Sequence, residues 1–166
     1  MEQAIAELDR GIEINSESAE AYHRRGDARS SIGSYEEAVD DYDKAIGLDG
    51  DTAAFYAGRG ATLVKMGEFG RAVRDHYQAI ELEPDNPALY DERGSTHMSL
   101  GEYRRATDDF DEAIRLDPNT ASYYANRGAA FAKQGKYNTA IREYGLAINI
   151  DPEQAEPYFE RGAAYA

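Results

Sequence analysis

Three histidines, His23, His76 and His97, are the side chains best suited to ligate a metal or to transfer a proton near neutral pH. They fall in different segments and on different predicted helix faces, so they do not form a ligand set, and the sequence contains no cysteine. We expect His76 and His97 to be buried in the core and His23 to line an exposed groove. The sequence therefore predicts no metal site and no cofactor.

Two glycine-containing segments resemble ligand-binding loops but lack the required residue order. Residues 58–65 lack the Gly-Lys-Ser/Thr order of a phosphate loop, and Asp49–Asp51 is followed by Ala53 where a calcium loop needs another ligand. Adjacent acids such as Asp40 and Asp41 recur periodically along the chain, which is typical of a solvated helix face. We therefore expect no enzymatic activity.

The 166 residues include 32 acidic residues and 18 lysines and arginines, which gives a formal net charge of −14. This charge repels phosphate, so neither nucleic acid nor an anionic membrane is an expected partner. Two acids within Met1–Glu7 stand where a signal peptide carries positive charge. The composition predicts a soluble, cytoplasmic protein.

The elements that position these side chains follow from an internal repeat of 34 residues. The dipeptide Arg-Gly recurs at Arg25-Gly26, Arg59-Gly60, Arg93-Gly94, Arg127-Gly128 and Arg161-Gly162. A tyrosine precedes each arginine by three residues, and Gly33, Gly67, Gly101 and Gly135 keep the same period. Two series of alanines recur with it, namely Ala38, Ala72, Ala106 and Ala140, and Ala45, Ala79, Ala113 and Ala147.

Each repeat has the hydrophobic spacing of two helices. Tyr90, Arg93, Gly94 and His97 share one helix face, and Gly101 stands where that helix should stop. A second helical pattern, from Tyr103 to Ile114, ends at Asp117-Pro118. No segment alternates with the period of a β-strand, so the expected fold is all-α.

This pattern of Tyr-x-x-Arg-Gly, a turn glycine, spaced alanines and a closing Asp-Pro resembles the tetratricopeptide repeat (TPR), specifically its Tyr-x-x-Arg-Gly subset. The resemblance implies a right-handed solenoid of antiparallel helix pairs that forms a single TPR domain over residues 1–166. Full repeats are expected at 19–52, 53–86, 87–120 and 121–154. Residues 1–18 would supply the second helix of a partial repeat, and residues 155–166 the first helix of another.

The arginine before each glycine, at repeat position 7, needs an acidic partner because an unpaired charge on a packing face is costly. Position 23 is always acidic and consists of Glu7, Asp41, Asp75, Asp109 and Glu143. Pairing within each repeat would leave Arg161 and Glu7 alone, whereas pairing with the preceding repeat satisfies all five arginines. We favour the second arrangement; pairing within the repeat and unrelated surface charges remain alternatives.

The resemblance to the TPR family also implies that the first helices line a concave groove that accepts a peptide or helix of a partner. The predicted groove residues are His23, Asp27, Ala57, Ala61, Val64, Lys65, Asp91, Glu92, Ser95, Met98, Ala125, Asn126, Ala129 and Lys133. The Lys–Asn pair with which some TPR co-chaperones hold a terminal carboxylate is absent, and Asp91 and Glu92 favour a neutral or basic partner. We expect a non-catalytic protein-interaction scaffold; a merely solvated surface remains the alternative.

A competing hypothesis concerns the two partial repeats, which carry no polar capping helix. Ile5, Tyr158 and Tyr165 belong to helix faces that in a complete repeat pack against a neighbouring helix. Copies of the chain could therefore stack head to tail. A chain of this kind could also decorate a protein polymer, as the kinesin-light-chain TPRs suggest. Frayed ends, or a fragment of a longer solenoid, remain alternatives.

Overall fold

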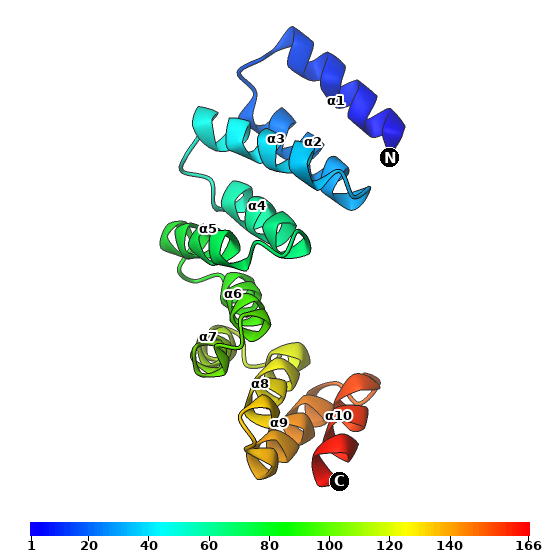
Figure 1. The fold of residues 1–166 in the computed structure, drawn as a ribbon, viewed down its shortest axis with the longest axis vertical. Coiled ribbons are helices and arrows are strands. Elements are labelled where there is room, and N and C mark those ends of the chain that lie inside the picture. Colours follow the sequence, from blue (N-terminus) through cyan, green and yellow to red (C-terminus); the bar gives the residue numbers. More distant parts are fainter. The chain divides into compact units, whose positions relative to one another are not determined.

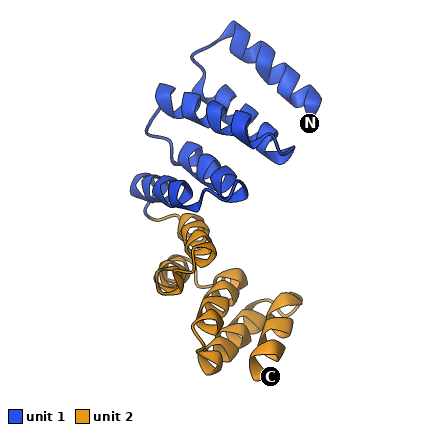
Figure 2. Cartoon of the chain, in the orientation of Figure 1, with its two compact units in different colours: residues 1–84 blue, residues 85–166 orange.

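The computed structural model describes all residues 1–166 and contains ten α-helices and no strand. The chain divides into two compact units, residues 1–84 and residues 85–166, coloured blue and orange in Figure 2. None of the ten helices is both long and apolar enough to span a membrane.

Unit 1 contains five helices that pack in chain order (Figure 1). They are α1 (Glu2–Ile14), α2 (Ala19–Ser31), α3 (Tyr35–Leu48), α4 (Ala53–Lys65) and α5 (Phe69–Leu82). The pairs α2–α3 and α4–α5 have the most extensive contacts, and α3 also packs on α4, and α1 on α2. The first helices α2 and α4 contact each other directly.

Unit 2 repeats this arrangement. Its helices are α6 (Pro87–Ser99), α7 (Tyr103–Leu116), α8 (Ala121–Lys133), α9 (Tyr137–Ile150) and α10 (Glu156–Tyr165). The pairs are α6–α7 and α8–α9, and α10 packs mainly on α9. The predicted all-α array of helix pairs is therefore confirmed within each unit. In the four complete repeats, the first helix begins at the first residue of the predicted repeat.

The turn glycine ends each first helix because it adopts a backbone conformation that other residues rarely adopt. Gly101 has φ 74°, and it follows α6. Its amide N–H donates to the carbonyl of Met98, and the amide of Glu102 donates to the carbonyl of His97. These two bonds satisfy carbonyls at the end of the helix and reverse the chain toward α7.

Inside each pair, a glycine of the first helix accommodates a ring of the second. A Cβ atom placed on Gly94 would lie 2.7 Å from Cε1 of Phe110, whose side chain is fully buried. In the other repeats, Gly26, Gly60 and Gly128 meet Tyr42, His76 and Tyr144 in the same way. The two series of alanines predicted from the repeat are completely buried beside these rings. The prediction that His76 and His97 are core histidines is confirmed, because both are almost fully buried.

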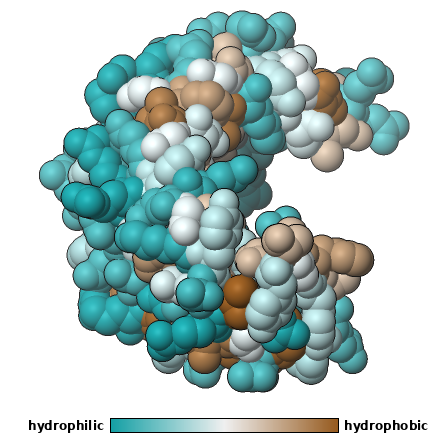
Figure 3. Space-filling view, turned by 60° about the horizontal axis from the view of Figure 1, so that its bottom comes forward, coloured by the Kyte–Doolittle hydropathy of each residue, from teal (hydrophilic) through white to brown (hydrophobic).

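The surface is largely polar, in keeping with the composition. On the face drawn in Figure 3, hydrophobic residues form separate patches among hydrophilic ones.

Candidate functional site

The arginines at repeat position 7 pair mainly with the acid of their own repeat. Arg25 donates to Asp41 from Nη2 at 2.6 Å and from Nε at 2.9 Å, and Arg59 donates to Asp75 from Nη2 at 2.7 Å and from Nε at 2.8 Å. In unit 2, Nη2 of Arg93 donates to Asp109 at 2.6 Å.

Arg127 likewise pairs with Glu143 of its own repeat. The favoured arrangement, in which each arginine pairs with the position 23 acid of the preceding repeat, is thus wrong for Arg25, Arg59 and Arg127. The physical reason is that the second helix of the same repeat packs directly on the face that carries the arginine.

A contact with the preceding repeat does exist, but it uses a different acid, at repeat position 25. Arg25 donates to Asp9 at 2.6 Å, and Arg127 donates to Asp111 at 2.6 Å. Arg59 pairs with Asp43 in the same manner. These arginines therefore bridge two repeats through two carboxylates. Glu7, which was expected to pair with Arg25, instead lies 3.5 Å from Arg10 at an exposed site.

In unit 1, residues predicted for the groove line a small pocket. The pocket has a volume of about 180 Å³ and is lined by Asp27, Ser30, Ser31, Tyr42, Gly58, Ala61, Thr62 and Lys65. These residues come from the two first helices α2 and α4 and from α3 behind them. Gly58 leaves room for the ring of Tyr42, because a Cβ atom there would lie 2.8 Å from Cε1 of that ring.

The polar groups of this pocket form hydrogen bonds with one another. The hydroxyl of Tyr42 donates to Oδ1 of Asp27 at 2.7 Å, and burial together with this bond raises the pKa of Tyr42 well above its ordinary value. Nζ of Lys65 donates to Oγ of Ser30 at 3.1 Å, and Oγ1 of Thr62 lies 2.9 Å from the same atom. The carboxylate of Asp27 and the ammonium of Lys65 are both exposed. The pocket thus offers a hydrogen-bond acceptor and a hydrogen-bond donor to a ligand.

His23 adjoins the pocket. Its ring centroid lies 4.9 Å from that of Phe55, and Nε2 lies 3.7 Å from Oδ2 of Asp27. Ala57 is half-buried, and Val64 packs partly against the buried cluster of Val39, Leu63 and Ala72. Val64 therefore offers less of its surface than the sequence suggested.

In unit 2, the predicted groove residues lie on α6 and α8, and Asp91 and Glu92 of α6 supply two carboxylates there. Nδ2 of Asn126 donates to Oδ1 of Asp91 at 2.8 Å. Burial raises the pKa of Asp91 despite this bond, and burial together with the charge of Asp91 raises the pKa of Glu92.

The remaining predicted residues of unit 2 differ in how much they expose. Ser95 and Lys133 are exposed, whereas Ala125 and Ala129 are half-buried. Met98 packs partly on the buried cluster of Ala106, Phe110 and Ala130, so it contributes only part of its side chain to this surface.

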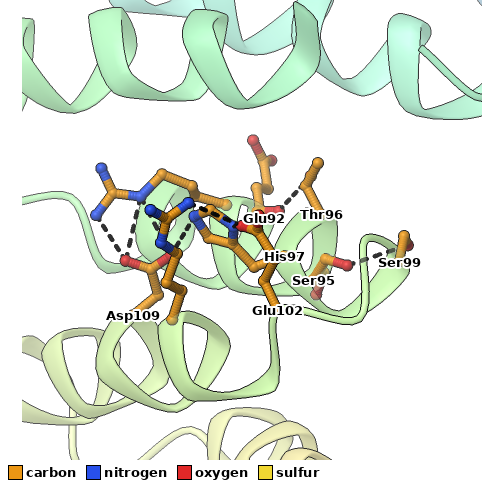
Figure 4. Close-up of polar contacts among 9 residues, drawn as sticks. Glu92, Ser95, Thr96, His97, Ser99, Glu102 and Asp109 are labelled. Atoms are coloured by element: carbon orange, nitrogen blue, oxygen red, sulfur yellow. Dashed lines mark hydrogen bonds and ion pairs between the residues drawn. The ribbon is translucent and has the colours of Figure 1, made fainter. Parts of the chain in front are cut away.

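The buried histidine of unit 2 lies between two carboxylates. Nδ1 of His97 is 2.7 Å from Oε2 of Glu102, and Nε2 is 3.8 Å from Oδ2 of Asp109 (Figure 4). Hydrogen bonds from Arg105 and His97 lower the pKa of Glu102. His97 occupies the place that Arg29 takes in the first repeat, where Nη1 of Arg29 donates to Asp41 at 2.7 Å. The cluster therefore fits a core ion-pair network rather than a catalytic site.

Unit 2 also contains an open pocket of about 480 Å³ that was not predicted from the sequence. It lies at the turn before α7 and the end of α8, and its lining residues are Gly101, Glu102, Tyr103, Arg104, Arg105 and Gln134. Nε2 of Gln134 donates to the backbone carbonyl of Tyr103 at 3.2 Å. Gln134 is polar where the other repeats carry Ile32, Met66 and Leu100. This polar residue was the one feature of the sequence that could have indicated the pocket.

The fold and the exposed first helices define a protein built from repeated antiparallel helix pairs. The sequence profile described as TPR repeat matches residues 26–67, 94–135 and 130–166, which together make up more than half of the chain. The chain belongs to the TPR family. No protein with curated annotation matches the sequence significantly.

Several solved structures share the fold. MamA (residues 41 to the end) from Desulfovibrio magneticus RS-1 is 19% identical with a TM-score of 0.86, covering 93% of this chain and 87% of that one. YrrB, a TPR protein with an unusual peptide-binding site, is 25% identical with a TM-score of 0.78, covering 95% and 81%. The first TPR of Spaghetti (RPAP3), bound to the HSP90 peptide SRMEEVD, is 24% identical with a TM-score of 0.67, covering 70% and 93%.

Proposed function

We propose that this chain is a non-catalytic protein-interaction scaffold that binds a peptide or helix of a partner protein on the exposed faces of its first helices. The observation that carries the proposal is the pocket of unit 1, which residues of two consecutive first helices build together. Ala61 lines the pocket with a small side chain, while Asp27 and Lys65 supply charged groups. Such a site suits a side chain and neighbouring amide groups of a bound segment.

Structural relatives support a peptide ligand without specifying it. YrrB has a peptide-binding site, and the first TPR of RPAP3 is bound to an HSP90 peptide. The HSP90 peptide ends in a carboxylate. The site proposed here differs in that it carries a carboxylate of its own, that of Asp27 beside His23, which would repel such an end. The net charge of −14 and the half-buried carboxylates of Asp91 and Glu92 favour a neutral or basic partner.

We also assign the chain to the Tyr-x-x-Arg-Gly form of the repeat. In the four complete repeats of this chain, the arginine binds the second helix of its own repeat. Its guanidinium lies over the preceding tyrosine, as in Arg25 on Tyr22 at 5.4 Å. Recurrence of the same motif from Arg25 to Arg161 supports a single TPR domain over residues 1–166.

The test is a peptide selected from a display library against this chain and then titrated by NMR. We expect shift changes at Asp27, Ala61 and Lys65 and saturable binding. Ala61→Arg should abolish this binding, because the new side chain fills the pocket while Ala61 itself is exposed and supports no core packing.

Asn149→Arg is the matched control, since it adds the same charge at an exposed position of α9. Binding that survives Ala61→Arg, or shift changes confined to the second helices, would refute the proposed site.

A further inference from the structure

The open pocket at the turn between α6 and α7 has a lining that does not recur along the chain. Its volume of about 480 Å³ is large enough for a side chain and the adjoining backbone of a bound segment. Two of its lining residues are the consecutive arginines Arg104 and Arg105 at the start of α7. At these two positions the other complete repeats carry Glu36-Glu37, Gly70-Arg71 and Asn138-Thr139. The pair of cations is therefore a local feature of unit 2 and not part of the repeat pattern.

The stability of α7 does not explain the charge of Arg104. The N-terminal end of a helix carries partial positive charge, so acidic side chains stabilise its first turn and basic ones destabilise it. Helix α3 follows this rule with Glu36 and Glu37, whereas α7 has no acid in its first turn. Arg104 consequently opposes the dipole of its own helix, and binding of an anion is the better explanation of its charge.

Both guanidinium groups can accept an anion from outside the chain. Arg104 is exposed and forms no ion pair within the chain. Arg105 uses only Nη1, which donates to Oε2 of Glu102 at 3.0 Å. The same oxygen lies 2.7 Å from Nδ1 of His97, so this carboxylate is held beside Arg105. The unused N–H groups of a guanidinium match the two oxygens of a carboxylate or the oxygens of a phosphate.

Gln134 lines the pocket from the end of α8 and holds a third cation beside it. Its Nε2 donates to the backbone carbonyl of Tyr103 at 3.2 Å, and its Oε1 accepts from Nζ of Lys136 at 2.7 Å. Nζ of Lys136 also lies 5.5 Å from the centre of the Phe131 ring. The ammonium group of Lys136 is therefore placed next to the two arginines of the lining.

From this arrangement we propose that the pocket binds a short acidic segment of a partner protein. One side-chain carboxylate of the segment lies between Arg104 and Arg105, and a neighbouring carboxylate lies at Lys136. The half-buried ring of Tyr103, which also lines the pocket, packs against an apolar residue next to the acids. None of the lining residues belongs to the predicted groove, so this inference is independent of the proposed function.

The other charges of the chain favour carboxylates over phosphate groups. Glu102 is part of the same lining, and it repels a phosphate group with its nearly two negative charges more strongly than a carboxylate with one. The net charge of −14 opposes a long polyanion such as nucleic acid. At about 0.15 M salt, charges beyond about 8 Å are screened, so a short segment responds mainly to the cations that it touches.

The first test is an NMR titration of the full chain with the peptide Ser-Leu-Glu-Glu-Leu-Ser, blocked at both ends. We expect saturable shift changes at the Nε–H groups of Arg104 and Arg105 and at the side-chain amide of Gln134, and none at Asp27 or Ala61 of the groove. The peptide with both glutamates replaced by glutamine should bind at least about tenfold more weakly. Equal binding of the two peptides, or no shift changes around this pocket, would overturn the inference.

Inorganic phosphate and a single-stranded oligonucleotide distinguish the segment from other anions. Under the same conditions we expect both to bind this pocket more weakly than the acidic peptide does. Tighter binding of either one would overturn the assignment of the pocket to a carboxylate-bearing segment.

The second test reverses the charge of one arginine. Arg104→Glu should weaken binding of the peptide at least about tenfold. Its thermal unfolding should stay the same or shift to a higher temperature, because Glu36 occupies the equivalent position of α3 and an acid suits the first turn of a helix.

Arg142→Glu is the matched control, since it makes the same charge change at an exposed position of α9 that does not line the pocket. This control should bind the peptide like the parent. Equal binding by the two variants would overturn the inference, because any effect would then come from the net charge of the chain and not from Arg104.

Discussion

Replacement of Arg59 by methionine tests how far the buried acids depend on their arginines. Asp75 is 6% exposed, and its two oxygens accept hydrogen bonds from Nε and Nη2 of Arg59 at 2.8 and 2.7 Å. No other cation lies within ion-pair distance of this carboxylate. Arg59→Met therefore leaves a charge that is buried and unpaired, and we expect it to reduce the free energy of unfolding by about 3–5 kcal/mol.

The first repeat provides an internal comparison, because its acid has a second cation. Asp41 accepts hydrogen bonds from Arg25 and also from Nη1 of Arg29, at 2.7 Å. Arg25→Met removes one charged partner and leaves the other in place. The loss should then be that of hydrogen bonds to a charged group, about 1.5–3 kcal/mol, and smaller than that of Arg59→Met.

The measurement is equilibrium urea unfolding followed by far-ultraviolet circular dichroism. The double variant Arg59→Met with Asp75→Leu should recover most of the loss, since it removes the stranded charge together with its partner. Equal losses for Arg25→Met and Arg59→Met would contradict the reasoning. So would a double variant that is no more stable than Arg59→Met alone.

Two further predictions concern the core. Gly94→Ala should destabilise the chain by about 1–2 kcal/mol in urea unfolding, because overpacking against Phe110 outweighs the gain of about 1 kcal/mol in helix propensity. Gly47→Ala, whose Cβ meets nothing within 4 Å, should stabilise it, and the same sign for both would refute the packing argument. Burial and the charges of Glu160 and Glu156 raise the pKa of Tyr144 to about 12, above the value near 10 in an unfolded chain, so its contribution to stability is complete below pH 10 and is lost as the pH rises through 12. The unfolding free energy of Tyr144→Phe should fall less over this pH range, and parallel pH profiles would argue against that shift.

The repeat made the helix pairs predictable from the sequence. Each complete repeat has a glycine that faces a ring, as Gly94 faces Phe110. The glycine is needed because the two helices approach each other closely at this point. The turn glycine at Gly101 was predictable for a similar reason, since its positive φ excludes most other residues. Repetition multiplies each such local signal, which is why helix ends and buried alanines followed from the pattern.

The partners of the arginines were not predictable in this way. A position 23 acid of the same repeat and one of the preceding repeat recur with the same period, so periodicity gives no means of choosing between Asp75 and Asp41 for Arg59. The second partner, Asp43, belongs to a position that is acidic in some repeats and Tyr77 or Gly145 in others. Because position 25 is acidic in only some repeats, the sequence predicts this second partner only weakly.

The sequence by itself determined the order of the helices, their ends and the recurring glycines and alanines that they bury, because these depend on spacing along one chain. The tertiary structure decided which charges meet, that Val64 and Met98 turn partly into the core, and that Asp27, Tyr42 and Lys65 border one pocket. These outcomes depend on the distances between helices that are neighbours in space. Residue spacing determines on which side of its own helix a side chain lies. Whether that side chain contacts another residue also depends on where the neighbouring helix lies.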